Sequence, residues 1–380
     1  MKIGILTFHF GNNYGGILQC YALQQILKSL GHDVEIINYK PIEKSFTKKV
    51  FNKLKTVYSL RVFLQLIIDY IIKKRHQSYN PENLSVDKKN ILKEFDRFRD
   101  EYLNITKNVN ENNIADMTMK YEAIIVGSDQ VWTSLYDKYP IYFLDWIPGF
   151  KGKKISYAAC SAHHSVQGNR ARYLKKILSE FELITVRDHT TANLIKQITG
   201  KTPDIVADPT CLYSFDEFIS KAESREPYIL TYILGSEIPG GHAAVLQKIK
   251  SSYGEMKVIS ILIPGGENTI ELYSDEVYKD ISPEKWVDLF SKATFVYTDS
   301  FHGVMFSTKF KKQFLAYYAN TIRASRLIDL KERFNLKDVI VDSVDNVVLG
   351  KFSYAEIEEL LSKYNTFSKK LLLSISDKNV

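Results

Sequence analysis

The stretch KIGILTFHFGNNYGGILQCYALQQILKSLGHDVEIINY (residues 2–39) predicts the fold class of this 380-residue chain. Its apolar run KIGILTF reads as a first strand and ends in the turn-rich segment HFGNNYGG. Apolar residues then recur at helical spacing between Ile17 and Leu30, and Gly31 stands where helices commonly end. The segment DVEIINY follows as the next strand. This strand–helix–strand order is typical of parallel α/β sheets covered by helices.

The same alternation continues through the rest of the chain. Further strands are predicted at YEAIIVG, KKISYAA, LITVRD and DIVADP, which begin at residues 121, 153, 183 and 204. The polar, proline-containing segment 213–227 is the best candidate for a domain boundary. A second series of strands follows it, at PYILTYILG, KVISILIP, TFVYTDS and KQFLAYY.

These patterns predict an α/β protein with two Rossmann-like domains, residues 1–215 and 225–345, separated by a central cleft. After Pro41 the rhythm of strands breaks, so we expect a helical insertion at 42–105 in the first domain. The amphipathic segment 353–372 predicts a C-terminal helix that packs across both domains.

The composition excludes several classes of protein. Hydrophobic residues make up 45% of the chain and charged residues 25%, which argues against fibrous, disulfide-rich and disordered proteins. No apolar run approaches the roughly 18 residues of a membrane span, and the N-terminus lacks the features of a secretory signal. The widely separated Cys20, Cys160 and Cys211 are expected to be free thiols in a reducing cytoplasm. No metal-ligand spacing is apparent.

The net charge of +7 is concentrated in one segment. Residues 42–80 hold nine Lys and Arg against Glu43 and Asp69, a local net charge of +7, so the rest of the chain is balanced. A basic segment with apolar residues at helical spacing suits the anionic surface of a membrane. The alternative is that its apolar face packs on the first domain or on a partner subunit. Its aromatic residues fall at helical spacing, which argues against a nucleic-acid platform.

The turn GNNYGG (residues 11–16) opens the first helix. Its exposed amides can hold an anion, and Asn12, Asn13 and Tyr14 then face the ligand. The alternative is a tight turn without a ligand. A dinucleotide site is disfavoured, because the turn is not GxGxxG and no acidic residue ends the next strand.

The segment VGSDQVW (residues 126–132) places polar side chains at the carboxyl end of a strand, where open α/β sheets bind ligands. Asp129 can accept a proton from a hydroxyl group, and Trp132 can stack on a sugar. The alternative is an Asp that caps a helix and a Trp in the core.

Two further strand ends carry cationic or titratable groups. Arg187 ends LITVRD and can clamp a phosphate or carboxylate, or else form an ion pair with Asp188 or another acid. TDSFHG (residues 298–303) places Ser300, His302 and Gly303 at the start of a helix, which makes a phosphate cradle with an imidazole beside it. His163 and His164 are expected at the rim.

The ordered motifs FGNNYGGILQCYALQ, VGSDQVW, ISYAAC, TVRD, ADPT, YILG and TDSFHG resemble the polysaccharide pyruvyl transferase family, from residue 3 to about 320. The resemblance implies a fold similar to GT-B glycosyltransferases, with the active site between the domains. It implies transfer of a pyruvyl group from phosphoenolpyruvate to a sugar of a cell-surface glycan, with formation of a ketal. No cofactor beyond that donor is implied.

The resemblance also implies roles for single residues. Arg187, His302, Ser300 and Gly303 match the donor side, presumed to be the second domain. Many family members have an Arg where this chain has Ser300, and Arg323 and Arg326 are candidates to supply that charge. Asn12, Asn13, Tyr14, Asp129 and Trp132 are assigned to the acceptor side in the first domain, with Asp129, Arg187 and His302 as the reacting groups.

Two other functions stay open at this stage. A GT-B-type glycosyltransferase would bind a nucleotide sugar on the same fold, although no acidic residue after His302 is spaced to hold a ribose. A non-enzymatic membrane or nucleic-acid adaptor would use the basic insertion. For the pyruvyl transferase we expect a cytoplasmic protein at the inner face of the membrane with a lipid-linked sugar acceptor, and no nucleic acid as partner.

Overall fold

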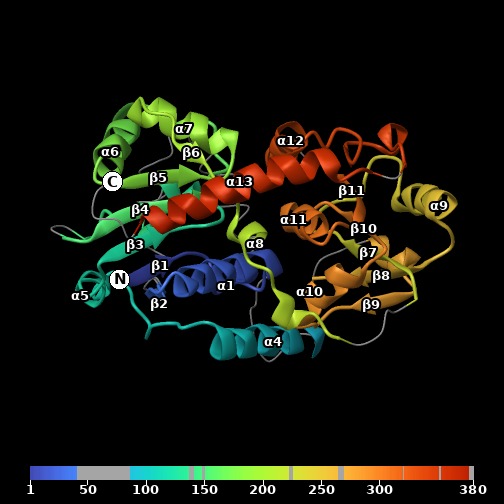
Figure 1. Cartoon of the computed structure of the whole chain (residues 1–380), viewed down its shortest axis with the longest axis horizontal. Coiled ribbons are helices and arrows are strands. Elements are labelled where there is room, and N and C mark those ends of the chain that lie inside the picture. Colours follow the sequence, from blue (N-terminus) through green and yellow to red (C-terminus); the bar gives the residue numbers. More distant parts are fainter. Residues whose placement is uncertain are drawn as a thin grey trace, which may run out of the picture.

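Two parallel β-sheets with helices packed on them form the protein, in a computed structural model that describes residues 1–40, 86–136, 141–147, 150–221, 226–263, 269–319, 321–350 and 352–375. Each sheet has six strands in this described part of the chain, and the two sheets lie side by side in separate lobes (Figure 1). The predicted α/β fold class with two Rossmann-like domains is confirmed.

The first sheet has the strand order β2-β1-β3-β4-β5-β6, and all its neighbours pair in parallel. Its strands are β1 (Lys2–Leu6), β2 (Asp33–Ile36), β3 (Ala123–Val126), β4 (Lys153–Ala159), β5 (Leu183–Val186) and β6 (Asp204–Ile205). Nearly every side chain of β1 and β3 is buried on both faces, as expected for a sheet covered by helices on two sides.

The helices of this domain follow the strands. They are α1 (Tyr14–Ser29), α4 (Val86–Tyr102), α5 (Ile114–Thr118), α6 (Gly168–Leu178), α7 (His189–Thr199) and α8 (Pro209–Leu212). Helix α1 begins at an N-cap, since the side chain of Asn13 accepts a hydrogen bond from the amide of Gly16 at 3.1 Å. It is buried along most of its length because it packs against β2, α8 and an element of the second domain, α10 (Pro283–Lys292).

The second sheet has the order β12-β11-β10-β7-β8-β9 and is also parallel. Its strands are β7 (Tyr228–Tyr232), β8 (Lys257–Ile261), β9 (Glu276–Tyr278), β10 (Phe295–Thr298), β11 (Gln313–Tyr317) and β12 (Ile340–Val341). Besides α10, its helices are α9 (His242–Tyr253), α11 (Phe301–Lys309) and α12 (Thr321–Arg333). Ser282 caps α10 and Pro283 occupies its first turn, as the sequence indicates.

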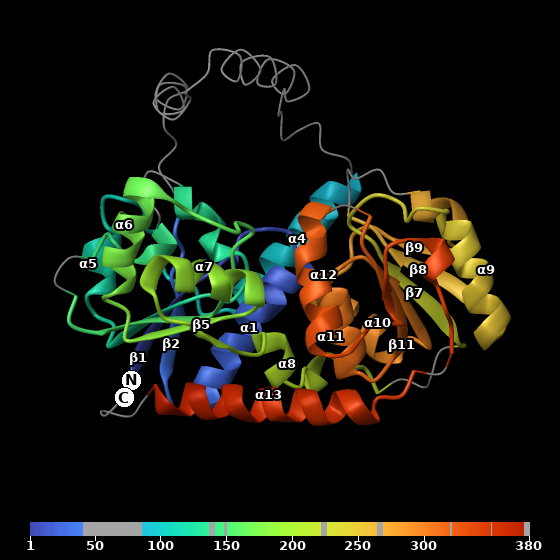
Figure 2. The same ribbon diagram turned by 90° about the horizontal axis from the view of Figure 1, so that it is seen from above.

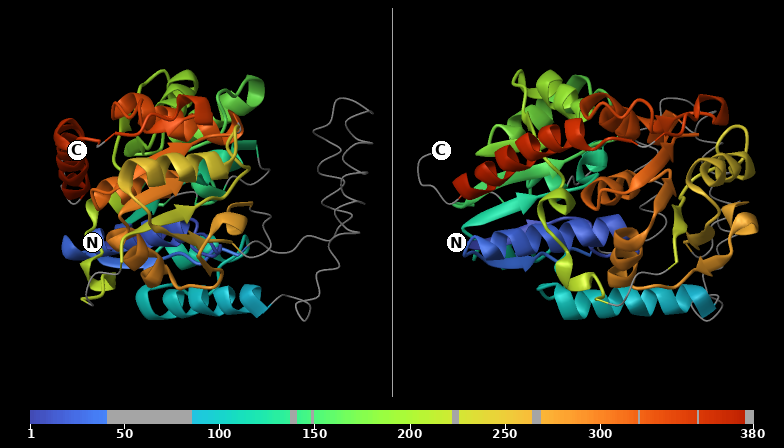
Figure 3. Two further views of the ribbon diagram at one scale, coloured as in Figure 1. Left: turned by 90° about the vertical axis from the view of Figure 1, so that its right-hand side faces the viewer. Right: turned by 45° about the vertical axis from the view of Figure 1, so that its right-hand side comes forward.

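Among the described helices, α13 and α4 lie along both domains. The C-terminal helix α13 (Ala355–Ser374) runs along one side of both lobes (Figure 2). Near its start, the Tyr354 hydroxyl donates to the Ser307 carbonyl of the second domain at 3.3 Å, and towards its end Ser368 Oγ accepts from the Ala207 amide at 2.9 Å. Helix α4 follows a different edge of the molecule (Figure 3), and its Arg97 pairs with Glu284 at 2.8 Å.

The predicted insertion is described only in part. Helix α4 lies within 42–105, and its side chains Ile91, Phe95 and Phe98 are buried in the core. The basic segment 42–80 lies outside the described residues. Within the described parts, no helix has the length and apolar character needed to cross a bilayer.

Candidate active site

Arg187 is the centre of a buried charged group between the domains. It follows β5, and its side chain is 1% exposed. Nη1 donates to Asp208 Oδ2 at 2.8 Å, and Nη2 donates to Asp129 Oδ1 at 3.1 Å and to Cys160 Sγ at 3.1 Å. Its guanidinium also lies 4.3 Å from the centre of the Phe301 ring. We call Arg187, Asp208, Asp129 and His302 the charged cluster.

These contacts distinguish between the two predicted roles of Arg187, a clamp for a ligand and an ion pair. The fork of the guanidinium is taken by two carboxylates, which is the ion-pair interpretation, and the expectation of an open fork for a ligand is not met. The partners are Asp208 and Asp129, not the adjacent Asp188. Asp188 instead caps α7, where its carboxylate accepts from the Thr191 amide at 2.7 Å.

Asp129 reaches Arg187 because the chain turns sharply after β3. Gly127 has a φ of +113°, and a Cβ there would lie 2.2 Å from the Tyr157 carbonyl oxygen, so the position requires glycine. Asp129 itself has a φ of +72°, a left-handed conformation that Asp tolerates better than most residues. Asp129 is therefore not a helix N-cap. It is buried, and its carboxylate faces the guanidinium of Arg187.

His302 enters the charged cluster from the second domain. It lies in the first turn of α11, with its side chain 7% exposed and Nε2 3.9 Å from Asp208 Oδ2. This is ion-pair distance but longer than a hydrogen bond. A Cβ on Gly15 would lie only 2.0 Å from His302 Nδ1, so the glycine-rich turn at the start of α1 lets the two domains meet at the imidazole.

The start of α11 offers backbone donors. The Ser300 amide donates to Thr298 Oγ1 at 3.1 Å, and among the described residues no side chain caps the helix. The next amides are therefore available to an anion, which the dipole of the nine-residue helix favours. A Cβ on Gly303 would lie 2.4 Å from Thr298 Oγ1, so Gly303 permits this tight strand-to-helix turn.

Burial and charge set the protonation of the charged cluster. Burial lowers the pKa of His302 below 6.5, with Asp208 and Asp129 acting in the opposite direction and Arg187 and Arg326 adding to the lowering. Burial alone would raise the pKa of Asp208, but the charge of Arg187, then that of His302, brings it below its usual value. Asp208 is therefore ionised and His302 neutral near pH 7.

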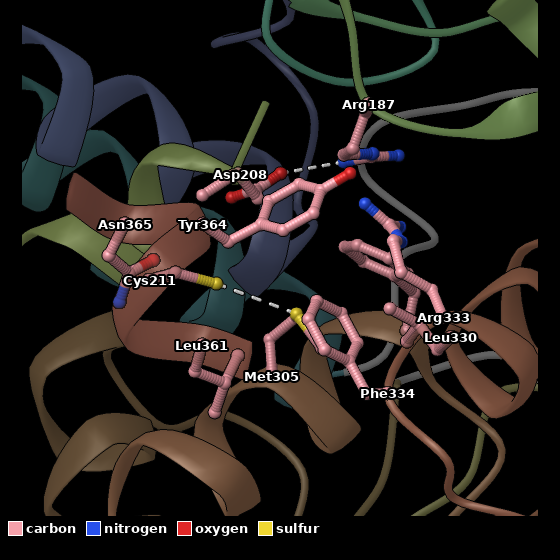
Figure 4. A pocket seen from close by; sticks show the side chains of 12 residues that line it. Arg187, Asp208, Cys211, Met305, Leu330, Arg333, Phe334, Leu361, Tyr364 and Asn365 are labelled. Carbon is pink, nitrogen blue, oxygen red and sulfur yellow. Dashed lines mark hydrogen bonds and ion pairs between the residues drawn. The ribbon is translucent and has the colours of Figure 1, made fainter. Parts of the chain in front are cut away.

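A narrow cavity adjoins the charged cluster on the side covered by α13 (Figure 4). It has room for about one water molecule. Arg187 and Asp208 form one wall, and the other walls include Arg333 of α12 and Asn365 of α13. Among the described residues, the buried atoms Arg187 Nε, His302 Nε2, Arg333 Nε and Asn365 Oδ1 have no hydrogen-bond partner. Buried polar atoms in this state are uncommon and mark a site able to take a ligand or water.

Two aromatic side chains assigned to the acceptor lie in the core instead. Trp132 is fully buried, stacks on Phe143 at 5.3 Å and donates from Nε1 to the Tyr142 carbonyl at 3.0 Å. Tyr14 is also fully buried, and its hydroxyl donates to the Ile281 carbonyl of the second domain at 2.9 Å. Neither ring presents a face to a sugar in this structure, because tertiary packing has covered both.

The remaining predicted residues are distributed as follows. Asn12 is half-buried and Asn13 is exposed, and Asn13 caps α1. Ser300 is buried at the start of α11. Arg326 of α12 lies close enough to His302 for its charge to act on that imidazole, whereas the side chain of Arg323 lies outside the described part. His163 is half-buried and His164 is exposed, both at the surface.

Asp208 is the residue that the sequence interpretation missed. It belongs to ADPT, a motif noted for its position but given no role, and it lies within ion-pair distance of both Arg187 and His302. An acidic residue followed by proline, at the end of the predicted strand DIVADP, was the available signal. Within the described residues, no group of three His, Cys or acidic side chains is arranged to hold a metal.

Comparisons with known proteins agree with this architecture. A model of the polysaccharide pyruvyl transferase family matches residues 13–320. No curated protein matches the chain significantly in sequence.

Solved structures share the fold over nearly the whole chain. UGT89C1 from Arabidopsis thaliana, complexed with UDP-L-rhamnose, is 11% identical, with 98% of each chain covered and a TM-score of 0.51. UDP-GlcNAc 2-epimerase from Methanocaldococcus jannaschii is 12% identical, with 100% of this chain and 94% of that chain covered and a TM-score of 0.50. At these identities the likeness shows the fold alone, which is the predicted GT-B-like arrangement.

Proposed function

Because the chain belongs to the polysaccharide pyruvyl transferase family, we propose that it transfers a pyruvyl group from phosphoenolpyruvate to a sugar of a cell-surface polysaccharide or its lipid-linked precursor. The product is a ketal across two hydroxyl groups of that sugar. The finer points, namely the donor, the ketal and the lipid-linked acceptor, are our proposal beyond the family.

One observation supports the donor most directly. His302, the uncapped start of α11 and the guanidinium of Arg187 meet at the boundary between the domains. Phosphoenolpyruvate carries a phosphate and a carboxylate. Its phosphate suits the amides at the start of α11, where a helix dipole and an adjacent imidazole both favour an anion.

The reaction needs proton transfers in two directions. The enol carbon C3 of the donor gains a proton, which leaves C2 cationic, and a sugar hydroxyl adds there after losing its own proton. The C2–O bond to phosphate then breaks, and inorganic phosphate leaves. A second hydroxyl adds to C2 and loses its proton. Of the two protons lost from the hydroxyls, one balances the proton gained at C3 and the other leaves with phosphate.

The residues of the charged cluster suit these steps. His302, once protonated, is the proton donor to C3, and Asp129 accepts a proton from the acceptor hydroxyl. Arg187 orients Asp129, and Arg326 is a further cation close to His302. Asp129→Asn is therefore expected to lower turnover more than donor affinity. We propose no cofactor or metal besides the donor substrate.

The location in the cell is proposed from the sequence. We propose that the protein works in the cytoplasm, at the inner face of the membrane, where residues 42–80 contact anionic lipids. Flotation with anionic vesicles tests this contact, which should weaken with salt and when Lys48, Lys49, Lys53 and Lys55 are changed to Glu. No binding at low salt would leave the segment as a packing element.

Calorimetric titration of the whole protein tests the donor. Phosphoenolpyruvate should bind saturably, while uridine and cytidine diphosphates should give no heat at the same concentrations. His302→Gln should weaken the binding, and His163→Gln, a surface control, should not. Binding of a nucleoside diphosphate without phosphoenolpyruvate would favour the glycosyltransferase, and binding of neither would favour the adaptor.

A further inference from the structure

Asp208 stands at the point where the two domains meet, held by the short helix α8 that it caps. Its Oδ1 accepts from the Thr210 amide at 3.0 Å and from the Thr210 hydroxyl at 2.8 Å. Helix α8 packs against α1, α11 and α13, so elements of both domains surround it. Because one oxygen is fixed by the cap, the direction of the other oxygen, Oδ2, is also fixed.

Oδ2 faces three side chains from three separate segments. Arg187 Nη1 donates to it at 2.8 Å, Ser128 Oγ lies 3.1 Å away, and His302 Nε2 lies 3.9 Å away. Ser128 Oγ is also 3.1 Å from the Ala158 carbonyl, so its single hydroxyl hydrogen is divided between two acceptors. Asp208 is fully buried, and its charge is therefore little screened by solvent.

The imidazole of His302 has one nitrogen directed towards this carboxylate. Gly15 of α1 lies against the Nδ1 side of the ring, which leaves Nε2 on the side of Asp208. Four charged groups act on the imidazole: Asp208 at the start of α8, Asp129 after β3, Arg187 after β5 and Arg326 on α12. The two cations oppose protonation of His302 and the two carboxylates favour it, with Asp208 the larger of the favourable pair.

We propose that Asp208 is the positioning residue of the site, which holds Arg187 with one contact and keeps His302 available for protonation with another. The role of His302 in this inference rests on the proposed function. Asp208 does not touch the reacting atoms. It acts through these two side chains: its hydrogen bond fixes the guanidinium of Arg187, and its charge 3.9 Å from His302 Nε2 stabilises the charged imidazole.

The charge balance of the site explains why such a residue is needed. Without a donor, the two positive charges of Arg187 and Arg326 equal the two negative charges of Asp208 and Asp129, so the site has no surplus positive charge for an anion. Protonation of His302 supplies that charge when the donor arrives, and the same proton is then the one delivered to C3. Asp208 therefore couples donor binding to the loading of the proton donor.

The experiment measures the pKa of His302 by nuclear magnetic resonance of the whole protein with 15N-labelled histidine. Among the eight histidines, the signals of His302 are those lost in His302→Gln. Asp208→Asn should lower the pKa of His302 by about 1, because a neighbouring negative charge is removed. Asp329→Asn, a change in another buried carboxylate at the domain boundary, should leave it unchanged.

A second variant moves the same pKa in the opposite direction. Ser128→Ala removes a hydroxyl that shares the negative charge of Asp208 Oδ2, so the pKa of His302 should rise by a smaller amount. A merely structural role for Asp208 would not produce opposite shifts in two variants. If Asp208→Asn does not fold, the rise in Ser128→Ala alone decides, and an unchanged pKa in that variant overturns the proposal.

The outcome is separable from the test of the proposed function, because the titration uses no substrate. Opposite shifts together with no pyruvyl transfer would support the role of Asp208 and refute the reaction. Pyruvyl transfer with an unchanged pKa of His302 in Asp208→Asn would support the reaction and overturn the role of Asp208. Where both hold, the pH dependence of activity that comes from protonation of His302 should lie at a lower pH in Asp208→Asn than in the native protein.

Discussion

The two domains meet in two regions of opposite character. One is an aromatic seam, made by Tyr14, Phe95, Tyr232 and Trp286. The ring of Tyr14 stacks on that of Trp286 with 5.7 Å between ring centres, and its centre lies 4.9 Å from that of Phe95. The other is the charged cluster of Arg187, Asp208, Asp129 and His302. The seam joins the domains by burying apolar surface, and the stabilisation from this burial changes little with pH. The charged cluster joins them through ionisable groups, so its state depends on protons and ligands.

The difference shows how one interface serves two purposes. Burial of large rings stabilises association without any need for a ligand. A buried ion pair contributes less, since desolvation opposes the attraction, and it is better explained by the chemistry it permits. We therefore expect changes in the seam to alter stability alone and changes in the charged cluster to alter activity and its pH dependence.

Removal of Arg187 should have the largest effect. Arg187→Ala leaves Asp208 and Asp129 buried without their cation, which should lower the free energy of unfolding by about 3–5 kcal/mol and abolish activity. Arg187→Lys keeps the charge but not the fork, so it should be more stable yet nearly inactive. Urea denaturation and a transfer assay measure the two effects. Native stability in Arg187→Ala would refute the ion-pair network.

Trp286→Ala tests the seam. The loss of a fully buried ring should lower the free energy of unfolding by about 3–5 kcal/mol, through lost apolar contacts and the cavity left behind. The loss should be the same at pH 6 and pH 8, since no titratable group of the charged cluster is involved. A loss that varies with pH would break the distinction between the two regions.

His302→Gln should separate activity from stability. The rate should fall by on the order of 10²-fold or more, as for other acid–base groups. The native pKa of His302 lies below 6.5, so between that pKa and 6.5 the unfolded chain binds more protons and native stability falls as the pH falls. His302→Gln removes this contribution, so the variant should lose less stability than the native protein between pH 7 and pH 5. An equal loss in denaturation measurements would show that His302 is not buried in its neutral form.

Adjacent glycines in α1 give the smallest and most local test. Gly15→Ala places a Cβ against the imidazole of His302, which should cost about 1–3 kcal/mol of stability and lower activity. In Gly16→Ala the nearest atom to the new Cβ is 3.6 Å away, so this control should be as active as the native protein. Equal activity in the two variants would mean that α1 does not position His302.

The sequence predicts best what depends on local pattern. The segment KKISYAA coincides with β4, and TDSFHG places His302 in the first turn of α11, because strand ends and helix starts have characteristic residues. It does not predict that Arg187 pairs with Asp208, a contact 21 residues apart that depends on where α8 packs. Nor does it reveal that Trp132 and Tyr14 are covered, because an aromatic side chain after a strand suits both a core and a ligand face.

A crystal structure of the protein with phosphoenolpyruvate tests the central claim most directly. We expect the phosphate within hydrogen-bond distance of the amides of Phe301 and His302, with the imidazole of His302 beside it and Asp208 still paired with Arg187. Donor density elsewhere, with the start of α11 empty and the charged cluster unchanged, would contradict this.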